Sequence, residues 1–535
     1  MSSSNLPASQ HAGDAYPDLY EAGIPELQDG LANGRFTSVD LVKAYLARVD
    51  EVNLKGPALR AVIETNPSAL AQAADLDRER KEKGSRGPLH GIPILLKDNI
   101  ATLHSEGMNT TAGSYALLGS VVPRDAAVAA KLRTAGAILL GKTNMSEWAN
   151  FRGQVPSGFS GRGGQCTCPY YPLVDPSGSS SGSGVAAAIG LAAGTLGTET
   201  DGSITSPGSR NNVVGVKPTV GLTSRAGVIP ISSHQDSVGP MTRTVTDAAI
   251  LLSAIAGPDP RDTYTLAQPE PMPDYTAALR ADALKGVRLG VPRSFAARPN
   301  EEAEPQAHIV RAFDAALEVI RGLGAEVVDP AEFPHAEAVK AGRDDELYVM
   351  TVDLKVDLNK YLAELVEVPT GVRDLADLIK FNEEHAEQEL PAPYWTDQSR
   401  FIQAQSLEAD EKYEKMVDAN YELGRARGID ATLQKYNLDA IVLPTHGKVQ
   451  CTHRPMLHIV PLGFQPDDLE PAAAEPVRKH GPGVPFGLAF MGTAWSEAKL
   501  LGYAYAFEQA TQARLMRRAY EEAVPKTQLA DVVGR

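Results

Sequence analysis

The sequence alternates short apolar runs with amphipathic helical patterns, and this alternation limits the folds open to its 535 residues. Residues 91–96 and 137–140 are apolar runs of strand length, and residues 126–135 between them have a helical pattern. The later chain repeats this order, with strand patterns at 287–291, 325–328 and 440–443 and a helical pattern at 309–323. Strands that alternate with helices are typical of an α/β fold. We therefore expect a central mixed, mostly parallel twisted sheet flanked by helices.

At roughly 100–200 residues per domain, a chain of this length would contain three to five domains. The strand–helix alternation, however, continues on both sides of the Pro- and acid-rich stretches at 258–274 and 296–306. We interpret these stretches as surface excursions rather than as linkers. The prediction is one large domain over residues 18–535, with a mostly helical insertion at 344–436 and a flexible N-terminus at 1–17.

The composition excludes several classes of partner. A net charge of −16 argues against nucleic acid or an anionic membrane as the main partner. No apolar stretch reaches the roughly 18 residues that cross a bilayer, and the N-terminus lacks the basic and apolar regions of a secretory signal. We therefore expect a cytoplasmic protein with a small-molecule or peptide substrate. The sequence leaves the oligomeric state open, with a homodimer as the assembly to test.

The cysteines do not point to a metal centre. Cys166, Cys168 and Cys451 are too few for a disulfide framework and fit a reducing compartment. With His453 they would make four zinc ligands, but their one-residue spacing is tighter than usual and the two pairs lie far apart in the chain. We expect no metal and no cofactor.

A Ser- and Gly-rich segment at 177–184 leads directly into an apolar run of small residues at 185–193. A flexible linker would not normally feed a buried helix, and a phosphate-binding loop would end in Gly-Lys-Ser or Gly-Lys-Thr. The segment does contain the Gly-x-Ser-x-Gly pattern of a nucleophile elbow around Ser180. That elbow needs a strand directly before it, whereas three prolines stand between 169 and 176.

A second serine, Ser203, lies in the Gly-flanked stretch Gly-Thr-Glu-Thr-Asp-Gly-Ser-Ile at 197–204. Gly202 permits a close approach of the backbone, and successive N–H groups in such a turn can form a concave site for an oxyanion. The two serine loops, together with Lys97 at the end of the apolar run 91–96, are therefore the candidates for chemistry.

In combination, these segments resemble the amidase signature family over nearly the whole chain. One matching motif ends at Lys97, and a second, at 197–204, contains Ser203. The others are 108–114, 141–148, 178–184, 216–219, 443–445 and 486–509. Several motifs in one order are far more specific than any one of them. The resemblance implies a single large α/β domain and a serine amidohydrolase that needs no cofactor.

The resemblance also implies the roles of individual residues. Ser203 corresponds to the nucleophile, Ser179 to a bridging serine held in a cis peptide, and Lys97 to the base. The implied oxyanion donors are the backbone N–H groups of Thr200, Asp201, Gly202 and Ser203. A serine hydroxyl needs a base, and a lysine with an ordinary pKa of about 10.4 can act as one only where burial lowers that pKa.

Departures from the family pattern bear on the substrate. Many members have Gly-Gly-Ser-Ile-Arg where this chain has Asp201-Gly-Ser-Ile-Thr205. This variant, with the segment 224–231, resembles the peptide-amidase branch more than the amidotransferase subunit that acts on charged transfer RNA. Cys168 stands where Asn is usual, which affects the pocket wall rather than the chemistry. Asp201 either binds a substrate amino group or completes the turn.

We therefore predict hydrolysis of a linear carboxamide through an acyl-enzyme on Ser203. The substrate stays open among a peptide C-terminal amide, an aryl amide and a carbamate. Two alternatives remain, an α/β-hydrolase-type esterase that uses Ser180 and a subunit of a glutamine-dependent amidotransferase.

Overall fold

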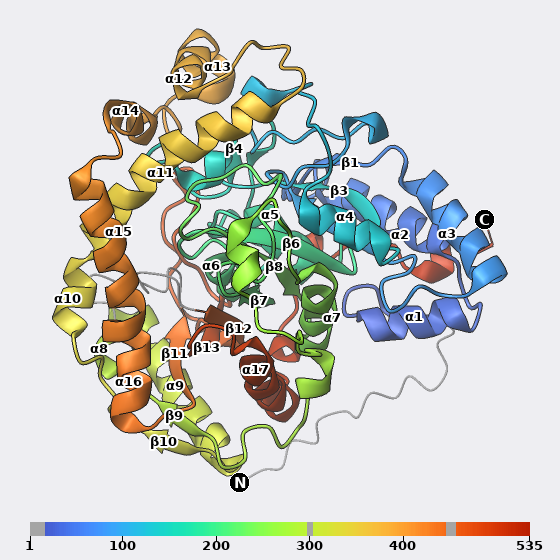
Figure 1. Ribbon diagram of the computed structural model, residues 1–535. Coiled ribbons are helices and arrows are strands. Elements are labelled where there is room, and N and C mark those ends of the chain that lie inside the picture. Colours follow the sequence, from blue (N-terminus) through green and yellow to red (C-terminus); the bar gives the residue numbers. More distant parts are fainter. Residues whose placement is uncertain (1–15, 297–302, 446–455, 535) are drawn as a thin grey trace.

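The computed structural model describes residues 16–296, 303–445 and 456–534, and this part of the chain is built around one large sheet (Figure 1). The sheet has eleven described strands in the order β1-β3-β2-β6-β8-β7-β12-β13-β11-β9-β10. They are β1 (Val62–Thr65), β2 (Pro93–Lys97), β3 (Ile138–Thr143), β6 (Gly194–Glu199), β7 (Val214–Lys217), β8 (Ser237–Thr242), β9 (Arg288–Gly290), β10 (Glu326–Val328), β11 (Ala440–Thr445), β12 (Met456–Phe464) and β13 (Pro485–Gly492). A separate antiparallel pair consists of β4 (Phe159–Ser160) and β5 (Gly164–Gln165).

The sheet is mixed, as predicted, but the prediction that it is mostly parallel is wrong. Among the described strands, β3, β2 and β6 are parallel neighbours, and so are β11, β9 and β10. The pairs β1·β3, β6·β8, β8·β7, β7·β12, β12·β13 and β13·β11 are antiparallel. Parallel neighbours need a crossover connection, usually a helix, whereas β7 and β8, and β12 and β13, are joined by loops. The strand patterns recognised in the sequence lie mainly in the parallel parts.

Helices cover the sheet and extend beyond it (Figure 1). They are α1 (Ile24–Ala32), α2 (Ser38–Val52), α3 (Ala69–Lys83), α4 (Ala127–Thr134), α5 (Ser181–Ala188), α6 (Thr205–Arg210), α7 (Val245–Ile255), α8 (Arg293–Ala296), α9 (Ala303–Gly322), α10 (Ala336–Ala341), α11 (Arg343–Glu364), α12 (Leu375–Glu384), α13 (Ala386–Glu389), α14 (Ser399–Ser406), α15 (Glu411–Gly424), α16 (Asp430–Tyr436) and α17 (Glu497–Thr511). None of the described helices has the length and apolar composition to cross a membrane.

Local sequence signals explain where several helices begin. In α2, the Thr37 hydroxyl accepts a hydrogen bond from the Asp40 N–H at 3.1 Å, and the Asp40 carboxylate accepts one from the Thr37 N–H at 2.9 Å. This reciprocal cap satisfies two N–H groups that a helix start leaves unpaired. Tyr45 and Val49 then bury one face of the helix. The helix α5 begins inside the Ser- and Gly-rich segment and is buried along its whole length.

Two apolar clusters fill most of the interior. One joins α2 and α5 to β2, β3 and β6. The other joins α7, α9 and α17 to β7, β11, β12 and β13. The end of β2 lies within the first cluster, so a side chain at that end is surrounded by the packed interior.

The helices α11 to α16 run along the left and upper sides of the view in Figure 1. Residues 344–436 fold mainly into these helices, in agreement with the expected secondary structure. The boundaries of this segment as an insertion remain a prediction. The predicted flexible N-terminus lies almost wholly outside the described residues, which begin with Tyr16 packed near the ring of Phe36.

Candidate active site

Lys97 is the last residue of strand β2 and lies in the interior of the molecule. This strand lies between β3 and β6, and the Lys97 side chain at its end is fully buried. Its Nζ donates hydrogen bonds to Ser179 Oγ at 2.8 Å, Ser180 Oγ at 2.8 Å and the Thr198 carbonyl at 3.0 Å. All three donors of the ammonium group therefore have partners.

Burial lowers the pKa of Lys97 from 10.5 to about 7. The negative charges of Asp236 and Glu199 oppose this effect and raise the pKa part of the way back. Near neutral pH a substantial fraction of Lys97 is therefore the neutral amine, which is the form that can accept a proton.

The loop before α5 presents two adjacent serines in different ways. The Gly178–Ser179 peptide is cis, and the Ser179 carbonyl accepts a hydrogen bond from the Ser146 N–H at 3.0 Å. Ser180 is also fully buried, and its hydroxyl donates to the Thr198 carbonyl at 3.1 Å. Ser179 borders a cavity, whereas Ser180 is enclosed between Lys97 and β6.

Glycine is required where α5 meets the strands. A Cβ atom at Gly182 would lie 2.1 Å from the carbonyl oxygen of Ala61 and 2.6 Å from the backbone nitrogen of Asn144. Any side chain at this position would push the serine loop away from Lys97. The Ser/Gly composition of the segment thus reflects close packing rather than flexibility.

Ser203 lies in the turn between β6 and α6, and Glu199 holds this turn together. The Glu199 carboxylate accepts hydrogen bonds from the N–H groups of Ile204 at 2.7 Å and Thr205 at 2.8 Å, and from the Thr205 hydroxyl at 3.0 Å. The Ser203 carbonyl accepts a hydrogen bond from the Ser180 N–H at 3.1 Å. The two serine loops are therefore joined by their backbones.

The backbone of this turn offers donors to a ligand. Gly202 has a φ of +85°, a conformation that favours glycine. Within the described part of the chain, the N–H groups of Gly202 and Ser203 donate no hydrogen bond. Unpaired N–H groups of this kind are what an oxyanion site requires.

One cavity of about 80 Å³ brings most of the predicted site residues together. Ser179, Ser203, Thr200 and Asp201 line it, while Lys97 lies behind Ser179. Among the described residues, no hydrogen bond joins the Ser203 and Ser179 hydroxyls. Catalytic hydrogen bonds are often long or misaligned without a substrate, and a rotation about χ1 of either serine would redirect its hydroxyl.

Asp236 is a site residue that the sequence analysis missed. Its carboxylate accepts hydrogen bonds from the Thr200 hydroxyl, from the Ile231 N–H at 2.8 Å and from the Ser232 N–H at 3.1 Å. Burial raises the pKa of Asp236 to about 6, although these hydrogen bonds oppose the shift. No motif marks Asp236 in the sequence, and β8, which follows it, was not recognised as a strand because of Pro240. The partner Thr200 could not be inferred from spacing.

The helical segment supplies the opposite wall of the cavity. Arg343, Glu346, Leu347 and Met350 from α11 and Arg400 from α14 line it. This wall is tied to the loop that carries Asp236. Ser232 Oγ donates to Asp353 Oδ2 at 2.5 Å, the Ser233 N–H to Asp357 Oδ2 at 2.7 Å, and Gln235 Nε2 to Glu346 Oε1 at 2.9 Å.

Two of the three cysteines lie within the described part of the chain. Cys166 and Cys168 are buried free thiols, and burial raises the pKa of Cys168 to about 12. Cys451 and His453 lie outside the described residues. Within the described part, no group of three or more His, Cys, Asp or Glu side chains is arranged to hold a metal ion.

Comparison with known proteins gives the class. A family model described as Amidase matches residues 40–501, which is most of the chain. The protein is therefore a hydrolase that acts on amide bonds. It belongs to the amidase family, as the motifs predicted.

Individual relatives agree with this assignment. A putative amidase from Arthroderma benhamiae is 43% identical over 524 residues, covering 93% of this chain and 87% of that protein. The solved peptide amidase from Stenotrophomonas maltophilia has a TM-score of 0.82 and 41% identity, covering 95% of this chain and 99% of its own. A glutamyl-tRNA(Gln) amidotransferase subunit from Geobacter metallireducens is 34% identical, covering 92% of this chain and 98% of that protein. The single α/β domain with a mixed sheet is thus a shared fold.

Proposed function

We propose that the protein hydrolyses a linear carboxamide through an acyl-enzyme on Ser203, with Ser179 and Lys97 as a proton relay. The observation that carries this proposal is the position of Lys97. It is a fully buried lysine with a pKa of about 7, hydrogen-bonded to a serine that shares a cavity with Ser203. A solvated lysine would lack both the lowered pKa and the serine partner.

Acylation follows from these positions. Neutral Lys97 accepts the proton of Ser179 while Ser179 accepts that of Ser203, since a hydroxyl can donate and accept at once. Ser203 Oγ bonds to the amide carbon, and the N–H groups of Gly202 and Ser203 stabilise the charge on the carbonyl oxygen. The relay then returns the proton to the leaving nitrogen as the C–N bond breaks.

Deacylation uses the same groups. A water molecule attacks the acyl carbon and gives its proton to the relay. The bond between Ser203 Oγ and the carbon breaks, Ser203 recovers a proton, and a carboxylic acid leaves. Every proton that Lys97 accepts is thus returned within one cycle.

The substrate class we favour is a peptide C-terminal amide. The cavity at Ser203 has a volume of only about 80 Å³, which suits a primary carboxamide better than a bulky leaving group. A related protein of the same fold, 41% identical over 95% of this chain, is a peptide amidase. Aryl amides and carbamates are the alternatives that the same assay tests.

The test is product release by the purified chain from peptide amides, anilides, esters and carbamates. Lys97→Ala and Ser203→Ala are expected to lose turnover while circular dichroism stays unchanged. Ser253→Ala is the matched serine control and should retain full activity, because the Ser253 hydroxyl lies on α7 and donates to the Ala249 carbonyl of the same helix. Full activity of either site variant would refute the proposal.

The esterase alternative makes a different prediction. A covalent serine probe followed by peptide mapping should label Ser203, whereas a label on Ser180 would favour the esterase. The structure supports the first outcome, because Ser180 is enclosed and its hydroxyl donates to the Thr198 carbonyl. No described strand directly precedes the serine loop, as a nucleophile elbow would need.

The amidotransferase alternative is separated by the assay components. Release of ammonia or amine by the chain without partner subunits would exclude it, and activity only in a complex would favour it. The same purified material gives the oligomeric state by light scattering, which tests the predicted homodimer.

A further inference from the structure

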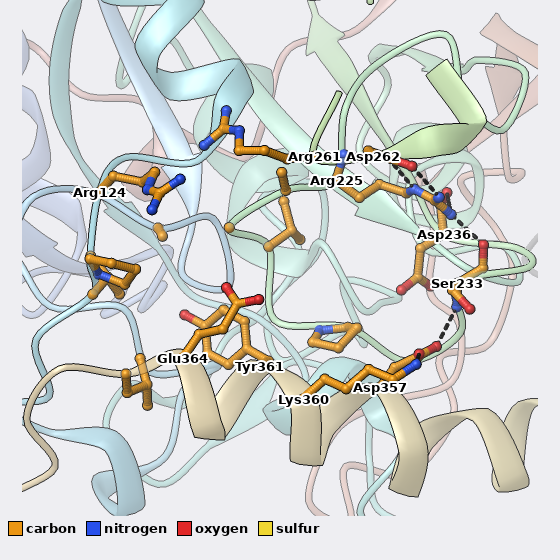
Figure 2. A pocket seen from close by; sticks show the side chains of 18 of the residues that line it. Arg124, Arg225, Ser233, Asp236, Arg261, Asp262, Asp357, Lys360, Tyr361 and Glu364 are labelled. Carbon is orange, nitrogen blue, oxygen red and sulfur yellow. Dashed lines mark hydrogen bonds and ion pairs between the residues drawn. The ribbon is translucent and has the colours of Figure 1, made fainter. Parts of the chain in front are cut away.

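A second cavity of about 620 Å³ lies outside the catalytic one (Figure 2). Its walls come from residues 122–124, the loop 225–236, residues 261–264 and the end of α11. It shares no lining residue with the cavity at Ser203. Its volume lies in the range of roughly 300–1,000 Å³ that is typical of small-molecule sites.

Most charged side chains around this cavity are paired with each other. Arg225 pairs with Asp262 at 2.7 Å, and Lys360 pairs with Asp357 at 3.5 Å. Arg261 is held by Asp259 at 2.9 Å. These pairs form the wall and leave little charge for a ligand.

Arg124 and Glu364 are the exceptions. Both line the cavity and are exposed to solvent, and neither has an ion-pair or hydrogen-bond partner among the described residues. Figure 2 shows Glu364 rising from α11 towards the cavity, while Arg124 faces it from a separate segment. The cavity therefore presents one cation and one anion that the described part of the protein does not neutralise.

A third group supports a polar ligand here. The hydroxyl of Tyr361 is buried and has no hydrogen-bond partner within the described structure. Buried polar groups are nearly always hydrogen-bonded, so this hydroxyl is available for a hydrogen bond with a polar ligand in the cavity. Val228 and Pro230 add an apolar surface to the same cavity.

We propose that this second cavity binds a free apolar amino acid as a zwitterion. The carboxylate pairs with Arg124, the ammonium group pairs with Glu364, and the side chain packs on Val228 and Pro230. A purely anionic ligand would leave Glu364 unpaired and repelled by the negative charge of the ligand. A purely cationic ligand would leave Arg124 unpaired and repelled by the positive charge. This proposal does not rest on the hydrolysis proposed at Ser203, although Asp236, the hydrogen-bond partner of Thr200, also lines the second cavity.

Isothermal titration of the full chain with three matched probes tests the proposal. L-Phenylalanine carries both charges, 3-phenylpropionate only the negative one and 2-phenylethylamine only the positive one. We expect saturable binding of phenylalanine and at least tenfold weaker binding of each half-ligand. Arg124→Ala should weaken phenylalanine and 3-phenylpropionate but not 2-phenylethylamine, and Glu364→Gln should weaken phenylalanine and 2-phenylethylamine.

The controls separate this site from the catalytic one. Glu367→Gln and Arg427→Ala change exposed charges that do not line the cavity, and both should bind phenylalanine like the wild type. Ser203→Ala should also bind normally, whether or not the chain hydrolyses amides. Any of three results would overturn the proposal. The first is no saturation at a phenylalanine concentration tenfold above a millimolar dissociation constant. The others are equal binding of all three probes and loss of phenylalanine binding in Ser203→Ala.

Discussion

Replacement of Lys97 by methionine should change how stability depends on pH. Burial lowers the pKa of Lys97 from 10.5 to about 7 in the fold, whereas the unfolded chain keeps the ordinary value. Between these two pKa values the unfolded state binds more protons than the folded state, so wild-type stability rises with pH in this window. Methionine does not titrate, and the variant lacks this contribution.

The magnitude follows from the shift. One pKa unit corresponds to about 1.4 kcal/mol, and the folded lysine is half protonated at pH 7, so wild type gains about 2 kcal/mol from Lys97 between pH 7 and pH 9. Well below pH 7 the buried charge costs the wild type about 5 kcal/mol. The variant also loses the hydrogen bonds to Ser179, Ser180 and the Thr198 carbonyl, at about 1 kcal/mol each. Because that loss varies little with pH, the pH dependence is the quantity to measure.

The assay is equilibrium urea unfolding from pH 6 to pH 9 of wild type, Lys97→Met and the exposed control Lys380→Met. The stability of Lys97→Met relative to wild type should fall by about 2 kcal/mol from pH 7 to pH 9, while the control should show no trend. A relative stability of Lys97→Met that is constant to within about 0.5 kcal/mol would show that the folded lysine keeps its ordinary pKa. The proposed base would then be charged at neutral pH and the relay would fail.

Three further predictions concern activity and packing. On the acid side, kcat/KM should fall with a midpoint near pH 7. Asp236→Asn should move this midpoint to lower pH, because the carboxylate charge raises the pKa of Lys97. The same midpoint in a folded variant would contradict this coupling. Glu199→Gln, which disturbs the turn that carries Ser203, should lower kcat roughly 100-fold with little change in KM in steady-state assays, on the scale of losing an oxyanion donor. Gly182→Ala should destabilise the fold by about 3 kcal/mol or more in thermal unfolding, because its Cβ would lie 2.1 Å from a carbonyl oxygen; a melting temperature within about 2 °C of wild type would refute the close packing.

Local signals in the sequence predicted much of the fold. The cap at Thr37 marked the start of α2, and the apolar runs at 91–96 and 137–140 correspond to β2 and β3. Strands with internal prolines were harder to recognise. Pro240 lies within β8 and Pro461 within β12, although proline normally argues against a strand inside a sheet. Tertiary packing overrides that rule here, and the missed strands account for the wrong estimate of parallel pairing.

The same division applies to the site. Ordered motifs identified Lys97, Ser179 and Ser203, and the structure brings them to one place. Their catalytic roles stay a prediction. Residues that act through long-range contacts, such as Asp236 through Thr200, carry no periodic or motif signal. Their identification needed the folded arrangement of loops that lie far apart in the chain.

The three hydrogen bonds between the loop 232–236 and α11 also restrict how substrate preference can change within such a fold. The helix α11, which lines the cavity at Ser203, and the loop 232–236, which contacts the turn at Thr200 through Asp236, are joined by these bonds, so neither can be exchanged alone. A segment grafted from a relative to alter selectivity would need acidic side chains at 353 and 357 and an acceptor at 346. Without these groups, the new segment would lose the hydrogen bonds to the loop 232–236. The turn that carries Ser203 would then be less firmly held.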